Sequence, residues 1–200
     1  NAFDMAESYA ELCKLSEGSN SWKVPEFFKR QASLNQPWNF TYVDTDISDG
    51  IATLTINSPE AMNALNEIVV NQLTNAIDKV NNDGSVDTIV LDGAGKAFVA
   101  GADVKFFVDK IREDSIDDIY EFTANGHKML NSIENSPKTT IALTTGLALG
   151  GGLELALSCD YRIGTRRTQF RFPETSIGIY PGLGRSQRPA KICGIPAARW

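Results

Sequence analysis

Three consecutive glycines, Gly150 to Gly152, stand directly before an apolar stretch of helical character that carries one glutamate, Glu154, in its first turn. At the start of a helix the backbone N–H groups lack intrahelical partners and the helix dipole is positive, so this position favours an oxygen that carries negative charge. Residues without side chains let a ligand approach those N–H groups. The pattern favours an oxyanion hole, although a tight turn that packs a helix closely against a strand would use glycine in the same way.

A nucleotide phosphate fits these glycines poorly. No Lys-Ser or Lys-Thr pair follows them, their spacing is not GxGxxG, and the segment around Lys96 lacks the glycine and the hydroxyl residue of a phosphate-binding loop. We therefore interpret "ALGGGLE" as a site for a carbonyl oxygen.

A second turn of small residues lies in "AFVAGADVK", residues 97–105, where a helix again follows an apolar run. Taken alone, this stretch is equally well explained as an ordinary helix start capped by Asp103. Taken together, the two turns can supply two N–H groups to one oxygen.

Two glutamates provide titratable groups near these turns. Glu154 belongs to an otherwise apolar segment, which predicts that it is buried. Glu174 lies in "FRFPETSIGIYPG", after an intervening strand that can return it to the glycines. Either glutamate alone is more often an ordinary helix-start or loop carboxylate. Buried together near an oxyanion hole, the two can divide the roles of general acid and general base.

The elements that must position these residues alternate between strands and helices. A β-hairpin is predicted near residues 40–56 around Asp49-Gly50, followed by a helix over "ALNEIVVNQLTNAIDKVNNDG". "VDTIVLDG" predicts a strand buried on both faces, "AGKAFVAGAD" a loop, and residues 103–136 a helical region broken near Ser115. The strands "TTIALTTG" and "YRIGT" are expected on either side of the glycine-led helix. This alternation predicts the α/β class.

The composition limits the classes of partner. The chain carries 19 Lys and Arg against 25 Asp and Glu, and this net charge of −6 argues against nucleic acid or an anionic membrane. No apolar run approaches the ~20 residues of a membrane span, and no secretory signal is recognisable, so a cytoplasmic location is expected.

Cys13, Cys159 and Cys193 are expected to be buried free thiols, with no metal site, because no CxxC or His/Cys cluster is present. His127, the only histidine, is expected at the surface or in packing.

Residues 1–39 differ in composition and residue pattern from the rest of the chain. They combine a short helical pattern with a Gly/Ser/Asn-rich stretch and two prolines, which predicts a linker or the tail of an upstream domain. Residues 40–200 are then the core domain. Because the chain begins with Asn1 and stops at Trp200 within helix-forming sequence, we expect it to be part of a longer protein.

Four motifs resemble the enoyl-CoA hydratase/isomerase (crotonase) superfamily in their order and separation: "EAMNAL", "AFVAGADVK", "GLALGGGLELALSCD" and "FRFPETSIGIYPGLGRSQR". The resemblance covers about residues 40–200. It implies a crotonase-like fold of repeated ββα units that binds an acyl-CoA thioester and assembles as a trimer or hexamer. Coenzyme A would be part of the substrate, and no other cofactor is implied. The family's C-terminal helices are expected to lie beyond Trp200.

The resemblance also implies site residues at the matching positions. The N–H groups of Ala102 and Gly151 would form the oxyanion hole, and Glu154 and Glu174 match the two hydratase glutamates. The other matches would contact the acyl-CoA or lie near the reacting water: Ala61, Met62, Ala64, Ala100, Asp103, Val104, Lys105, Gly150, Pro181 and Gly182.

The presence of both glutamates bears on the reaction. Family members that isomerise double bonds or hydrolyse thioesters generally change one of these positions, so the resemblance implies an enoyl-CoA hydratase of fatty-acid or short-chain acyl-CoA metabolism. Such an enzyme adds water reversibly to a 2-enoyl-CoA and gives a 3-hydroxyacyl-CoA. An isomerase, an acyl-CoA hydrolase and a non-catalytic binding paralogue are the alternatives. Glu60, where many hydratases carry a basic residue, and the early end of the chain leave the non-catalytic paralogue open.

The N-terminal segment carries a second, shorter resemblance. "AFDMAESYAELC" and "VPEFFKRQ" resemble the end of a 3-hydroxyacyl-CoA dehydrogenase helical domain, as in bifunctional proteins that join a dehydrogenase to a hydratase. An unrelated linker explains the segment equally well. No dinucleotide fingerprint is present in the sequence.

Overall fold

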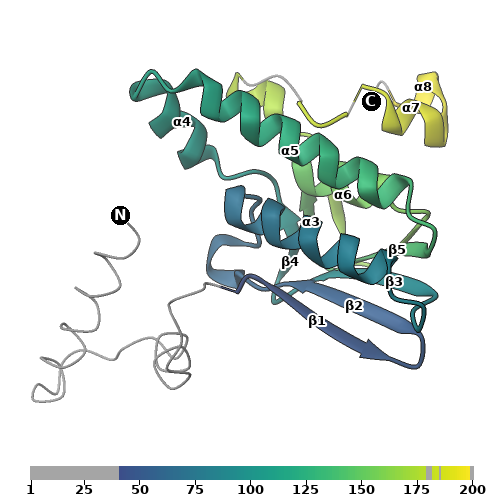
Figure 1. The fold of residues 1–200 in the computed structure, drawn as a ribbon. Coiled ribbons are helices and arrows are strands. Elements are labelled where there is room, and N and C mark those ends of the chain that lie inside the picture. The colour runs from purple at the N-terminus through teal and green to yellow at the C-terminus, as the bar shows by residue number, and fades with distance from the viewer. Residues whose placement is uncertain (1–40, 179–181, 185, 199–200) are drawn as a thin grey trace, which may run out of the picture. The chain divides into compact units, whose positions relative to one another are not determined.

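The elements follow one another as β-β-α units in a computed structural model that describes residues 41–178, 182–184 and 186–198 (Figure 1). Three units end in helices: α3 (Glu67–Asn81), the pair α4 (Val104–Arg112) and α5 (Ile116–Glu134), and α6 (Gly151–Ser158). The strands are β1 (Val43–Ser48), β2 (Ile51–Ile56), β3 (Thr88–Gly93), β4 (Ala97–Ala100), β5 (Thr139–Thr144), β6 (Leu147–Leu149), β7 (Tyr161–Gly164) and β8 (Gln169–Arg171). The short helices are η1 (Pro59–Ala61), η2 (Glu174–Ile177), α7 (Arg188–Cys193) and α8 (Ile195–Ala198). This order confirms the α/β class and the repeated ββα units, whereas the prediction for residues 1–39 lies outside the described residues.

The strands form two sheets, and their topology sets the place of the site. The larger sheet has the order β1-β2-β3-β5-β7 and the smaller one the order β4-β6-β8. Strands β4 and β6 are parallel, with Ala100 opposite Leu149 at their carboxyl ends. Because the carboxyl ends of parallel strands lie at one edge of a sheet, the turns that lead into α4 and α6 begin next to each other.

The first hairpin confirms the prediction around Asp49-Gly50. Strands β1 and β2 pair antiparallel, with Ser48 opposite Ile51, so a two-residue loop connects them. Both loop residues have positive φ, 52° at Asp49 and 78° at Gly50. Two central residues with positive φ define the type I′ turn, whose twist matches that of the strands it joins.

The core lies between the sheets and the helices. Helix α3 lies over β1 and β2, and α5 runs beside α3 (Figure 1). Asn66 is the N-cap residue of α3, and its side chain accepts a hydrogen bond from the Val69 amide. The helical region predicted over residues 103–136 is confirmed, including its break near Ser115. The largest fully buried side chains include Leu54, Leu65, Leu73, Ile77, Leu91, Phe98, Met129, Leu130 and Leu155. Among the described helices, none has both the length and the apolar character to cross a membrane.

Two predictions of local structure are wrong. The segment "AGKAFVAGAD", expected to be a loop, contains β4, whose Ala97, Phe98 and Val99 are buried. Strand β3, expected to be buried on both faces, instead alternates between buried and half-buried residues. Two of the four residues of β4, Phe98 and Val99, are of types that favour strands, whereas alanine is depleted in them. The pairing of β4 with β6 and its burial complete this short strand.

The described cysteines differ in their environments. Cys159, at the end of α6, is a buried free thiol, as predicted, whereas Cys193 is free but exposed, which corrects the prediction for that residue. Cys13 lies outside the described residues. Burial raises the pKa of the Cys159 thiol to about 12, because an apolar environment disfavours the thiolate.

This difference predicts selective alkylation. In the native protein at about pH 8, iodoacetamide is expected to modify Cys193 and to leave Cys159 unmodified, because the thiolate is the reactive species. Digestion and mass spectrometry of the two peptides check this, with protein unfolded in guanidinium as the control in which both are labelled. Labelling of native Cys159 as fast as Cys193 would contradict the prediction.

Candidate active site

The two turns of small residues lie side by side, as the sequence predicts. A Cβ atom built on Gly151 would lie 3.9 Å from the Ala102 backbone nitrogen. Gly101, which has a φ of +96°, approaches the carbonyl oxygen of Leu149, since a Cβ there would lie 3.6 Å from that oxygen. The start of α6 and the turn before α4 therefore border the same small space.

The backbone at Ala102 is oriented by a bridge to Leu65. The Leu65 N–H donates to the Gly101 carbonyl over 2.8 Å, and the Asp103 N–H donates to the Leu65 carbonyl over 2.9 Å. Because a parallel bridge uses the groups on either side of the central residue, the N–H of Ala102 itself points away from Leu65. Within the described part of the chain, the amides of Ala102 and Gly151 donate no hydrogen bond. They remain available to a ligand oxygen.

Glycine is required at two positions where α6 begins. Gly150 has a φ of 48° and a ψ of −121°, a conformation that other residues rarely adopt. A Cβ at Gly152 would overlap the carbonyl oxygen of Val99 in β4. The structural explanation of the triple glycine, close packing of a helix on a strand, is thus correct for Gly152. It coexists with open amide groups at Gly151.

Glu154 is buried in the first turn of α6, with 2% of its surface exposed, as its apolar neighbours predict. Its Oε1 accepts a hydrogen bond of 3.0 Å from the backbone N–H of Leu183. Leu183 directly follows Gly182, which lies next to Thr123 of α5, since a Cβ on it would be 3.8 Å from Thr123 Cγ2. Pro181, also predicted for this stretch, lies outside the described residues.

Glu174 returns to the glycines after β8. It opens η2, is half-buried, and its Oε1 lies 3.0 Å from the position that a Cβ on Gly150 would occupy. Strand β8 is itself attached to this turn, because the Gly150 N–H donates to the Arg171 carbonyl over 2.9 Å. The structure thus brings both predicted carboxylates to the start of α6.

The loop predicted to contact the acyl-CoA lies along the same turn. Ala61 ends η1 and is followed by Met62 and Ala64, and the Met62 carbonyl accepts a hydrogen bond of 3.1 Å from the Ala100 N–H. Two segments that are far apart in sequence are therefore joined through their backbones. Asp103 caps α4 through the Lys105 N–H at 3.0 Å, and the next two residues, Val104 and Lys105, are exposed.

Asn63 fixes this loop, and sequence reasoning did not single it out. Its side chain is fully buried, and its Oδ1 accepts a 2.9 Å hydrogen bond from the Ser58 N–H. Its Nδ2 lies 2.9, 2.8 and 3.2 Å from the carbonyl oxygens of Ala94, Ala97 and Phe98. Its φ of 58° is one that asparagine tolerates better than most residues. A buried amide with these partners connects the loop to both ends of the β3–β4 turn.

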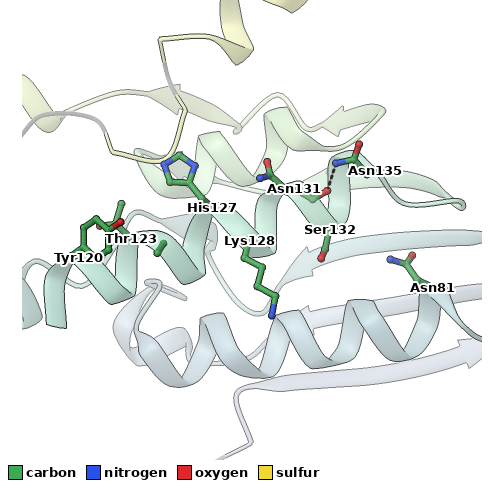
Figure 2. Close-up of a pocket in the computed structure, with 9 residues that line it drawn as sticks. Asn81, Tyr120, Thr123, His127, Lys128, Asn131, Ser132 and Asn135 are labelled. Atoms are coloured by element: carbon green, nitrogen blue, oxygen red, sulfur yellow. Dashed lines mark hydrogen bonds between the residues drawn. The ribbon is translucent and has the colours of Figure 1, made fainter. Parts of the chain in front are cut away.

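An open groove of about 920 Å³ runs along α5. Figure 2 shows that His127 and Lys128, which line it, leave the helix in different directions. The other lining groups are mostly amides and hydroxyls, and none of the predicted site residues is among them. His127 is half-buried, in agreement with the role in packing or at the surface expected for it.

The sequence model of the enoyl-CoA hydratase/isomerase family matches residues 51–194, which include both turns and both glutamates. The chain belongs to the enoyl-CoA hydratase/isomerase family. The residues that border the start of α6 are therefore the candidate active site of this chain.

Relatives within this family carry hydratase names. The chain is 42% identical over 150 residues to crotonyl-CoA hydratase of Syntrophomonas wolfei, a match that covers 74% of the chain and 56% of that protein. It is 39% identical to short-chain-enoyl-CoA hydratase of Clostridium acetobutylicum, with the same two shares covered. The chain thus spans about half the length of the curated relatives it matches.

A solved structure of the family agrees with the fold. The crystal structure of enoyl-CoA hydratase from Bacillus anthracis superposes with a TM-score of 0.74 at 28% identity. The match covers 80% of this chain and 61% of that chain. This similarity confirms the crotonase-like fold expected from the motifs.

Replacement of Asn63 by alanine is expected to lower the free energy of unfolding by about 2–4 kcal/mol, because it leaves buried carbonyl groups and the Ser58 N–H without their partner. Urea titration followed by circular dichroism measures this. Asn71→Ala, at an exposed position of α3, is the matched control and should change stability by less than about 0.5 kcal/mol. Equal effects of the two substitutions would refute the assigned role of the Asn63 amide.

Gly152→Ala is expected to destabilise the protein by about 2–3 kcal/mol, because the added methyl group overlaps the Val99 carbonyl and forces α6 away from β4. Gly84→Ala is the matched control, since no atom lies within 4 Å of a Cβ at that position. Thermal unfolding of the two variants separates the cost of packing from the general effect of a glycine substitution. A Gly152→Ala variant as stable as Gly84→Ala would show that the approach of α6 to β4 tolerates a side chain.

Proposed function

We propose that the protein containing this chain is an enoyl-CoA hydratase, which adds water reversibly to a 2-enoyl-CoA and forms a 3-hydroxyacyl-CoA. One observation carries the proposal: two glutamates and two backbone amides border the start of one buried helix. Membership of the family and the hydratase names of its relatives support this reaction. The names also support a short-chain enoyl-CoA as the substrate.

In the proposed reaction, the thioester carbonyl of the substrate lies between the N–H groups of Ala102 and Gly151. Attack of water on the β-carbon moves electron density onto the thioester oxygen, so two donors already in position stabilise the enolate-like transition state. The positive end of the α6 dipole adds to this stabilisation. The orientation of Ala102 by its bridge to Leu65 supports its role as a donor.

Glu154 is proposed to orient the water and to take one of its protons as the oxygen bonds to the β-carbon. Glu174 is proposed to give a proton to the α-carbon, so that one water is added in total. Glu154 then holds a proton that Glu174 has lost, and exchange with solvent restores both groups before the next turnover. Burial of Glu154 on the Leu183 amide supports its role, because a fixed carboxylate can hold water in one orientation.

The remaining assignments concern the substrate. We propose that the loop of Ala61, Met62 and Ala64 and the stretch from Ala100 to Lys105 contact the acyl-CoA, and that coenzyme A enters only as part of the substrate. The backbone bonds that hold these two segments together support a shared binding surface. The trimeric or hexameric assembly, the cytoplasmic location, the absence of a metal site and an upstream dehydrogenase stay predictions from the sequence.

Glu154→Gln and Glu174→Gln are each expected to slow the hydration of crotonyl-CoA by at least about 10²-fold, because each removes one partner of the proton transfers. Loss of the absorbance of the conjugated thioester measures the reaction in the complete protein that contains these residues. Glu113→Gln, at a side chain that is 61% exposed, is the control and should leave turnover unchanged.

The wild-type result decides between the family's reactions. If the wild-type protein binds acyl-CoA but does not hydrate crotonyl-CoA, the hydratase proposal is refuted and an isomerase, a hydrolase or a binding protein is favoured. Turnover that survives both glutamine substitutions would keep the reaction but overturn the assignment of the pair.

A further inference from the structure

Leu183 is held through its backbone on both sides. Its N–H donates to Glu154 Oε1 over 3.0 Å, and its carbonyl oxygen accepts a hydrogen bond of 2.5 Å from Arg188 Nη1. Arg188 is the first residue of α7 and lies five positions further along the chain. One residue therefore links the guanidinium of Arg188 to the carboxylate of Glu154.

Arg188 stands where an arginine is costly. Only 7% of its surface is exposed, and it starts a helix, where the dipole disfavours a cation. A buried charge is tolerated when it is paired and hydrogen-bonded. The pairing comes from Glu134 at the end of α5, whose Oε2 lies 3.2 Å from Arg188 Nε and 3.1 Å from Nη2. Asn131 Oδ1, one turn earlier, lies 3.4 Å from Nη2.

The backbone makes room for this guanidinium at Gly184. A Cβ on that residue would overlap Arg188 Nη1, and its φ of +106° is one that other residues rarely adopt. The planar fork of arginine can reach a carbonyl and a carboxylate at once, whereas the ammonium group of lysine is a compact point charge. Gly184 and Arg188 therefore fit each other, and Glu134 fixes the guanidinium from the side of α5.

We propose that Arg188 is a positioning residue for Glu154. Anchored by Glu134, it fixes the Leu183 carbonyl and so keeps the Leu183 N–H on the Glu154 carboxylate, which sets the orientation of that carboxylate toward the substrate. Arg188 itself does not touch the substrate. The inference rests on the proposed function, because it assigns a task to Glu154, and it extends the site to the end of α5.

Kinetics of the complete protein test this with Arg188→Gln, Arg188→Lys and Glu134→Gln. A misoriented base is expected to lower kcat for crotonyl-CoA hydration by about 10- to 100-fold with KM nearly unchanged. Arg188→Lys should recover only a small part of the loss. Lys191→Gln is the matched control, because Lys191 is the exposed partner of the same Glu134 carboxylate, 3.6 Å from its Oε1. It should leave kcat unchanged.

Hydrogen exchange of the Leu183 amide gives a readout that does not depend on activity. It should become faster in Arg188→Gln and in Glu134→Gln, and stay slow in Lys191→Gln. If the wild type lacks hydratase activity, the proposed function fails, and the exchange rates still decide whether Arg188 controls the Leu183–Glu154 bond. Folded Arg188→Gln and Glu134→Gln variants with unchanged kcat and unchanged Leu183 exchange would overturn the inference. A fall in melting temperature alone, at wild-type kcat, would reduce Arg188 to a structural role.

Discussion

The contact between Gly152 and the Val99 carbonyl is the constraint on which the site depends. It sets how closely α6 lies on β4, and through α6 it sets the place of the Gly151 amide and of Glu154. A helix moves as a rigid body, so a displacement at Gly152 would carry both groups with it. An oxyanion hole depends on donors that are held about 3 Å from the developing charge. The packing at Gly152 and the position of the proposed donor at Gly151 are thus two consequences of one close approach.

The topology explains why the second amide lies within reach. Strands β4 and β6 are neighbours in a small parallel sheet, so the turns that follow them open at one edge. In open parallel sheets, ligands generally bind at the carboxyl ends of the strands, where the loops converge. Here the loop before α3 also borders this edge, because the Asn63 side chain binds the Ala94 and Ala97 carbonyls around the β3–β4 turn. The alignment of Leu65 with Ala102 follows from that attachment and orients the Ala102 N–H.

Local features of the sequence were predictable, and distant partners were not. The Asp49-Gly50 turn, the burial of Glu154 and the break near Ser115 follow from patterns within a few residues. Strands β6 and β8 have three residues each and β4 has four, so all three are too short for a periodic pattern to predict them. Asn63 and Arg188 were not singled out, because each has only one partner nearby in sequence and the others lie 31 to 57 residues away along the chain. Only the fold shows that these polar groups are buried and satisfied.

The Arg188 guanidinium and the Glu154 carboxylate are linked through the backbone of Leu183. A guanidinium bound directly to a carboxylate favours its ionised form and so weakens it as a base. The structure places the Arg188 guanidinium on Glu134 and on the Leu183 carbonyl, and a backbone amide on Glu154. A backbone amide that donates to a carboxylate forms a charge-assisted hydrogen bond, which can hold the orientation of that carboxylate. In the proposed arrangement, Arg188 therefore acts on Glu154 through the Leu183 peptide groups and not by pairing its own guanidinium with that carboxylate.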